Sequence, residues 1–246
     1  MRQFWISLVA LGLMGCGSAS KARSEINVAT AANLTRAFGE LGAAFERNNG
    51  IHVVFSFGAT TQLAQQIENG APYDVFAAAD TEHVDELARK SLILPDTRAV
   101  YARGKLVLWV PDVKTAVNRL EDLAASPVTH IAIANPKLAP YGRAAAETLH
   151  ALRIWDAVQA KIVYGENISI ATQYAATGNA DVAFTAKALV LDRSGRKIDV
   201  PDNLHQPIDQ AIAVLRGTSK PDQARQFVAF VTGADGRAIL RQYGYE

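Results

Sequence analysis

The feature that most constrains the fold is a regular alternation, from Glu25 onward, of short apolar, β-branched runs with segments of helical periodicity. In segment 34–45, leucine and phenylalanine recur every three or four residues, and Asn49-Gly50 follows as a typical helix end. This alternation predicts an α/β protein with mixed, mostly parallel sheets. The predicted strands are 26–29, 52–57, 75–78, 105–110, 131–134, 182–184 and 211–215, and the predicted helices lie around Leu34, Leu63, Val84, Leu120, Leu149 and Tyr174 and after Pro221.

The length and continuity of the chain indicate two lobes. Its 246 residues are 49% hydrophobic, which is enough for one large core or two smaller ones. No Pro/Gly-rich linker or internal repeat separates independently folding domains. We expect 1–24 to be an export signal and tether, 25–104 with 205–246 to form one lobe, and 105–204 to form the other, with a hinge between them.

The N-terminus has the features of a bacterial export signal. Arg2 provides a basic start, residues 4–13 are an apolar run too short to span a bilayer comfortably, and Leu13-Met14-Gly15-Cys16 resembles a lipobox. We expect a periplasmic protein with lipid attached at Cys16, or alternatively cleavage after Ser20. Cys16 is the only cysteine, which excludes an intrachain disulfide and a thiolate metal cluster.

Ligand recognition has to be local, because a formal net charge of +1 creates no broad field for nucleic acid or an anionic membrane. Small and polar residues stand at four strand-to-helix junctions. A helix start carries unpaired N–H groups and a partial positive charge, so it binds anions without lysine or arginine. The junctions are Ala31-Ala32-Asn33, Gly58-Ala59-Thr60-Thr61, Pro140-Tyr141-Gly142 and Glu166-Asn167-Ile168.

Convergence of these junctions would create a cage made only of hydrogen-bond donors. Asn33 and Thr60 would contribute side chains, and backbone N–H groups would come from the neighbourhood of Tyr141 and Ile168. A fully deprotonated tetrahedral oxyanion accepts at every oxygen and donates nothing, so such a cage suits it. Taken singly, each junction is also explained as an ordinary capped helix, since Asn and Thr are common N-caps.

An exported enzyme is the alternative from another functional class. Asp74, Asp80, Glu82 and His83 are close in sequence and could imitate acid–base or metal chemistry. However, Asp80 and Glu82 fit a helix cap and first turn, and the five histidines show no paired ligand spacing. We therefore expect neither catalysis nor a bound bare metal cation, and no cofactor.

Several motifs carry a family resemblance that spans 26–245. The segments Val28-Ala29-Thr30-Ala31-Ala32-Asn33-Leu34-Thr35, Phe57-Gly58-Ala59-Thr60-Thr61-Gln62-Leu63-Ala64 and Gly70-Ala71-Pro72-Tyr73-Asp74-Val75-Phe76, with Asn135-Pro136, Tyr141-Gly142 and the closing Arg241-Gln242-Tyr243-Gly244-Tyr245, carry it. In these segments the chain resembles the molybdate-binding proteins of bacterial ABC importers. The resemblance implies a type II periplasmic-binding-protein fold, delivery of the ligand to a membrane permease, and a monomer.

Carried over by these motifs, the resemblance implies Asn33, Thr60, Tyr141 and Ile168 as ligand residues, with Ala32 as a further candidate for a backbone N–H. Some family members have serine in place of Asn33 and Thr60, which keeps a donor at both positions. Many relatives also have a ligand-binding tyrosine where this chain has Phe184, and phenylalanine cannot donate a hydrogen bond.

The choice among oxyanions stays open in the sequence. We expect both molybdate and tungstate to bind, with sulfate or phosphate as the alternatives. A phosphate that keeps a proton requires an acceptor carboxylate, and Glu166 is the one acidic residue within the four junctions. An inward-facing Glu166 would favour phosphate, and an outward-facing one would leave molybdate preferred.

Overall fold

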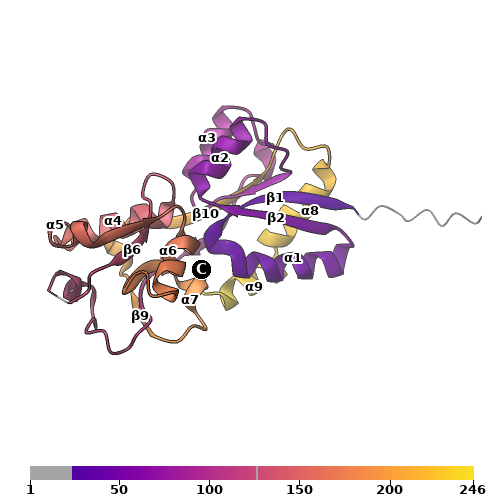
Figure 1. The fold of residues 1–246 in the computed structure, drawn as a ribbon. Coiled ribbons are helices and arrows are strands. Elements are labelled where there is room, and N and C mark those ends of the chain that lie inside the picture. The colour runs from indigo at the N-terminus through magenta and orange to yellow at the C-terminus, as the bar shows by residue number, and fades with distance from the viewer. Residues whose placement is uncertain (1–23, 126) are drawn as a thin grey trace, which may run out of the picture.

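The computed structural model describes residues 24–125 and 127–246, so the predicted export signal and Cys16 lie outside the described residues. The chain forms two lobes, each containing a five-stranded sheet flanked by helices (Figure 1). The α/β two-lobe fold is therefore confirmed. Within the described ranges, no helix combines the length and the apolar character needed to cross a membrane.

The first sheet has the strand order β2-β1-β3-β10-β4. Strand β1 lies parallel to β2 and β3, whereas β10 is antiparallel to both β3 and β4. Four strands therefore run in one direction and only β10 is reversed, as expected for a mixed, mostly parallel sheet. The strands are β1 (Glu25–Ala31), β2 (His52–Gly58), β3 (Val75–Ala77), β4 (Ala99–Gly104) and β10 (Ile208–Val214), and the helices of this lobe are α1 (Thr35–Asn49), α2 (Thr60–Glu68), α3 (Glu82–Arg89), α8 (Pro221–Thr232) and α9 (Ala234–Gln242).

The second sheet repeats this plan with the order β7-β6-β8-β5-β9. Strand β6 is parallel to β7 and β8, and β5 is the reversed strand between β8 and β9. Its elements are β5 (Leu106–Val110), β6 (Ile131–Ala134), β7 (Ile162–Gly165), β8 (Val182–Ala186) and β9 (Arg196–Asp199), with α4 (Pro140–Ala151), α5 (Trp155–Val158), α6 (Ile168–Ala176) and α7 (Lys187–Val190).

Aromatic packing fixes α1 against the first sheet. Phe38 and Phe45, on the buried face of α1, contact Phe227 of α8 at ring-centroid distances of 6.2 and 5.2 Å, both edge to face. Gly50 ends the helix with φ 68°, and its N–H donates to the Glu46 carbonyl. The apolar periodicity seen in the sequence is thus the face that anchors α1, and with it the junction before α1.

The chain crosses between the lobes at the β4–β5 step and again in the segment before β10. At the first crossing, Gly104 lies so close to the second lobe that a Cβ there would be 2.0 Å from the Tyr141 hydroxyl. The neighbouring β10 brings Gln210 opposite Ala102 of β4. The crossing strands therefore lie directly against the second lobe.

Three strands were missing from the sequence prediction, and all three are at sheet edges: β4, β7 and β9. None of the side chains in β9 is fully buried, so it lacks an apolar signal. The helix predicted around Leu120 is a 3-10 helix, Leu120–Ala124. Other 3-10 turns are Ala32–Leu34, Pro95–Thr97, Gln159–Lys161 and Asp202–Leu204.

Candidate functional site

The four predicted junctions meet at one cavity between the lobes. The cavity has a volume of about 10 Å³, roughly the room for one water molecule. The ends of β1 and β2 supply one wall, and the starts of α4 and α6 supply the other. The lining residues are Ala31, Ala32, Asn33, Gly58, Ala59, Thr60, Ala79, Ala139, Pro140, Tyr141, Asn167 and Ile168.

Three helix starts contribute backbone N–H groups with no hydrogen-bond partner among the described residues, those of Thr60, Tyr141 and Ile168. Each belongs to the first turn of α2, α4 or α6, where a helix cannot satisfy its own donors. At α6, the Asn167 side chain accepts from Ser169 and from the residue after it, which leaves the Ile168 N–H unused. Three unpaired donors and three positive helix ends therefore lie at one cavity.

Two glycines allow the second-lobe helices to start this close to the sheet. A Cβ on Gly142 would lie 2.2 Å from the carbonyl oxygen of Ala134 at the end of β6. A Cβ on Gly165 would lie 2.5 Å from the backbone nitrogen of Ala171 in α6. Both contacts are with backbone, which cannot easily yield, so a side chain at either position would displace a helix start from the cavity.

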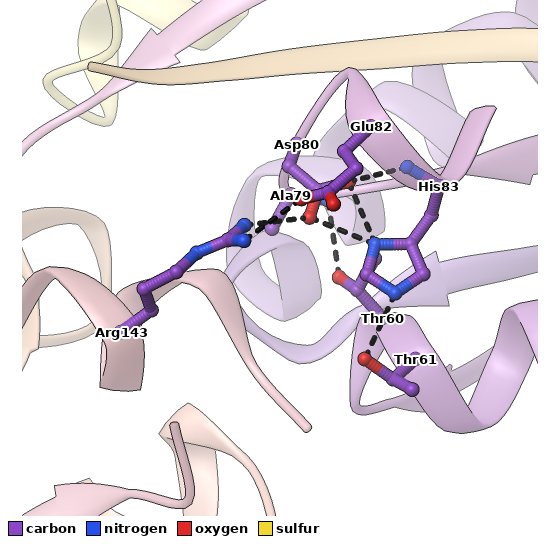
Figure 2. Close-up of polar contacts among 7 residues, drawn as sticks. All are labelled: Thr60, Thr61, Ala79, Asp80, Glu82, His83 and Arg143. Carbon is purple, nitrogen blue, oxygen red and sulfur yellow. Dashed lines mark hydrogen bonds and ion pairs between the residues drawn. The ribbon is translucent and has the colours of Figure 1, made fainter. Parts of the chain in front are cut away.

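The Thr60 side chain is buried and oriented as a donor. Its Oγ1 accepts a hydrogen bond from the Ala79 N–H at 3.2 Å (Figure 2). Because the oxygen already accepts this bond, the hydroxyl proton remains free to donate to another partner. Thr60 is only 1% exposed and lines the cavity, so its hydroxyl can donate to a ligand there.

Asn33 belongs to a neutral network at the hinge side of the cavity. Its Nδ2 donates to Gln210 Oε1 at 2.9 Å and to the Tyr245 hydroxyl at 3.1 Å. Gln210 Nε2 donates to the Tyr141 hydroxyl at 3.2 Å, and the Tyr101 hydroxyl donates to Gln210 Oε1 at 3.1 Å. Burial raises the pKa of all three tyrosines, so their hydroxyls stay protonated and uncharged.

A charged network bridges the lobes near the other wall. Arg143 of α4 pairs with Asp80 at 3.3 Å and with Glu82 at 2.8 Å, as Figure 2 shows. His83 Nδ1 lies 2.9 Å from Asp80 Oδ2, and His83 Nε2 lies 2.9 Å from the Thr61 hydroxyl. This cluster thus connects the first turn of α2 to an ion pair that spans the two lobes.

The arrangement of Thr61, His83 and Asp80 imitates a hydrolase triad in its distances, but Thr61 does not line the cavity. Burial alone would lower the pKa of His83, and the hydrogen bond and charge of Asp80, with Glu82, outweigh burial and raise it. Asp74 of the same sequence cluster is structural, since it accepts from the Asn27 N–H at 2.7 Å.

The remaining sequence candidates have clear positions. Ala32 lines the cavity, and its carbonyl accepts from Ser169 Oγ across the lobes at 2.9 Å. Glu166 is exposed and accepts from Gln62 Nε2 at 2.6 Å, so it faces outward. Phe184 is fully buried in β8 and does not line the cavity.

Sequence reasoning did not single out the residues that support the site. Gln210 precedes the apolar run 211–214 of β10 and is the one fully buried polar residue of that strand, a signal that could have been noticed. Ala79 has no distinguishing signal, and its role depends on the backbone N–H alone. Among the described residues, no group of three His, Cys, Asp or Glu side chains could hold a metal ion.

Two α/β lobes that meet over a small cavity define a two-lobe binding protein. A family model described as bacterial extracellular solute-binding protein matches residues 26–246, and the chain belongs to this family. It is 36% identical to the molybdate-binding protein ModA of Rhodobacter capsulatus over 228 residues, 91% of this chain and 89% of the relative.

Solved structures agree with this assignment. The periplasmic molybdate-binding protein of Azotobacter vinelandii matches with a TM-score of 0.83 and 34% identity, covering 90% of this chain and 98% of that chain. The sulfate-binding protein SubI of Mycobacterium tuberculosis matches with a TM-score of 0.78 at 14% identity, covering 90% and 86% of the two chains. The second likeness shows the shared fold only.

Proposed function

We propose that this chain captures molybdate, and also tungstate, at the interlobe cavity and delivers it to the membrane permease of an ABC importer. The observation that carries the proposal is the convergence of three unpaired helix-start N–H groups and the free Thr60 hydroxyl, with no carboxylate lining the cavity among the described residues. Such a set suits an anion that only accepts hydrogen bonds. The relatives named as molybdate-binding proteins support the choice of ligand.

The proposed ligand residues are Asn33, Thr60, Tyr141 and Ile168, with Ala32 adding a backbone N–H. Each charge-assisted hydrogen bond to the anion contributes about 1.5 to 3 kcal/mol. Four or five such bonds sum to about 6 to 15 kcal/mol, and submicromolar affinity, about 8 kcal/mol after the entropic cost of capture, requires the upper part of this range. No lysine or arginine is needed, because the helix dipoles supply the positive potential.

Ligand entry requires the lobes to separate. The cavity is lined by residues of both lobes and is only about 10 Å³ in this arrangement, so the ion enters while the lobes are apart. We propose that the lobes comprise 25–104 with 205–246 and 105–204, and that they open by bending at the two crossing segments. Closure then brings the donors of both lobes around the ion.

Sulfate and phosphate are the competing ligands. The exposed position of Glu166 leaves no carboxylate at the cavity to accept the proton of a hydrogen phosphate, which supports a fully deprotonated ion. Sulfate has the same charge and shape as molybdate, so the cavity has to distinguish the two by size. Phe184 offers no donor to either ion.

The proposed setting follows from the family. We propose that the mature chain is a monomer outside the cytoplasmic membrane, in the periplasm, either lipidated at Cys16 or cleaved after Ser20. The donor-only site requires no cofactor and no catalytic group, and molybdenum enters only as its oxyanion. A putative ABC transporter substrate-binding lipoprotein of Bacillus subtilis, 26% identical, supports the importer and the anchor.

Thermal unfolding of the mature chain with each oxyanion in turn tests the proposal. A ligand that binds only the folded state raises the unfolding midpoint by mass action. Molybdate and tungstate are expected to raise it, and sulfate and phosphate at the same concentration are expected to raise it far less. Equal stabilisation by sulfate would contradict the proposed specificity, and no stabilisation by any of the four would contradict the site.

A further inference from the structure

One atom of the proposed site has no hydrogen-bond partner although it is buried. Among the described residues, Asn33 Oδ1 accepts no hydrogen bond, and Asn33 as a whole is only 1% exposed. Both protons of its Nδ2 are directed at Gln210 and Tyr245 instead. A buried acceptor of this kind normally finds a partner, so its isolation calls for an explanation.

The isolated atom has the wrong polarity for an oxyanion. Asn33 lines the cavity, and an anion there requires a donor, whereas Oδ1 is an acceptor. A half-turn of the side-chain amide exchanges the positions of Oδ1 and Nδ2 without moving the rest of the residue. After that turn, Nδ2 takes the position that now lacks a partner and can donate to the ligand.

Gln210 can follow the same half-turn. At present its Oε1 accepts from Asn33 and its Nε2 donates to the Tyr141 hydroxyl. If both amides turn, Gln210 Nε2 donates to Asn33 Oδ1, and Gln210 Oε1 accepts a hydrogen bond from the Tyr141 hydroxyl. Tyr101 keeps its separate bond to the Ala78 carbonyl at 3.1 Å. The Tyr245 hydroxyl keeps its bond to the Asn33 carbonyl at 2.9 Å and loses the one that it accepts from Asn33 Nδ2. The network therefore has two hydrogen-bonding patterns, and the turned one lacks only that bond.

Building on the proposed function, we propose that Gln210 is a positioning residue that turns the Asn33 amide so that its N–H group faces the oxyanion. Gln210 is fully buried on β10, next to the β4 crossing strand, and contacts residues of both lobes. Through Gln210, the orientation of the Asn33 amide therefore depends on the crossing strands between the lobes. Both patterns need a residue that can donate and accept, and the Gln210 amide does both.

A double-mutant cycle measured by isothermal titration calorimetry with molybdate tests this role. Gln210→Met removes the amide at similar volume, so the turned Asn33 leaves its Oδ1 unpaired, and affinity is expected to fall about 10-fold. In an Asn33→Ser background the hydroxyl donates without a fixed orientation, and Gln210→Met is expected to change affinity by less than about 2-fold. An equal loss in both backgrounds would show that Gln210 is merely structural and overturn the inference.

Side-chain amide NMR of the unmutated chain provides a second readout. Signals of Asn33 and Gln210 are assigned by their disappearance in Asn33→Ser and Gln210→Met. Added molybdate is expected to shift both sets of amide protons together, because both amides turn. A shift at Asn33 with Gln210 unchanged would overturn the concerted turn but leave the proposed function intact. Failure of the unmutated chain to bind molybdate in calorimetry would instead refute the proposed function, and the inference with it.

Discussion

Two networks that join the lobes near the cavity are built from opposite kinds of groups. At the hinge side, Asn33 contacts the neutral Gln210 and Tyr245. Near the other wall, Arg143 joins the lobes through Asp80 and Glu82 (Figure 2). In our proposal the neutral network can reverse the direction of its hydrogen bonds, whereas the charged network cannot. We therefore propose that the neutral network orients a ligand-binding group and that the charged network holds the lobes together.

The largest expected effect comes from placing charge in the neutral network. Asn33→Asp exchanges an amide for an isosteric carboxylate that repels a dianion and cannot donate to it. Placing a carboxylate next to a bound dianion costs several kcal/mol of binding free energy. Molybdate affinity should therefore fall by at least about 100-fold in calorimetry. Asn179→Asp, on an exposed turn, makes the same charge change as a control and should leave affinity unchanged. Retained binding by Asn33→Asp would move the ligand away from Asn33.

The next effect separates two adjacent threonines. Thr60→Val removes the hydroxyl that accepts from Ala79, and the lost charge-assisted bond should weaken molybdate binding by about 1 to 3 kcal/mol. Thr61→Val is the matched control, because its hydroxyl contacts His83 and does not line the cavity. It should change affinity by much less. If the control weakens binding as strongly as Thr60→Val, the charged network also takes part in ligand binding.

A smaller effect is expected from the interlobe ion pair. The Arg143 side chain is 44% exposed, so solvent screens its pairing with Asp80 and Glu82. Arg143→Gln should weaken molybdate binding by about 0.2 to 1 kcal/mol at low salt, and the difference from the unmutated chain should shrink at high salt. Arg98→Gln removes an ion pair within the first lobe, to Asp85, and should leave affinity unchanged. An unchanged affinity for both variants would show that the pair does not stabilise closure.

The smallest effect concerns pH. The pKa of His83 is raised above its ordinary value of 6.5, so the folded state binds the proton more tightly than the unfolded state. The protonated His83 therefore contributes to the free energy of unfolding. This contribution is complete below pH 6.5, the ordinary pKa, and is lost as the pH rises through the higher pKa of the folded state. The unfolding midpoint of the unmutated chain should therefore fall over that window relative to His83→Asn. Parallel curves for the two chains would contradict a raised pKa.

The sequence was most informative where local rules operate. The apolar spacing of 34–45 predicted α1, and the helix starts at Thr60, Tyr141 and Ile168 were predicted as donors from junction chemistry alone. The edge strands β4, β7 and β9 escaped prediction. Edge strands such as β9 bury little, so hydrogen bonds to the neighbouring strand hold them in place more than an apolar pattern does.

The sequence by itself therefore determined the class of fold and the chemistry available at four junctions, because helix starts and apolar periodicity are local properties. Only the tertiary structure decided that the four junctions share one cavity, that Glu166 faces outward, and that Gln210 contacts Asn33 from 177 residues away. These outcomes depend on how two lobes and two crossing strands pack together. No local pattern encodes which polar groups such packing brings into contact.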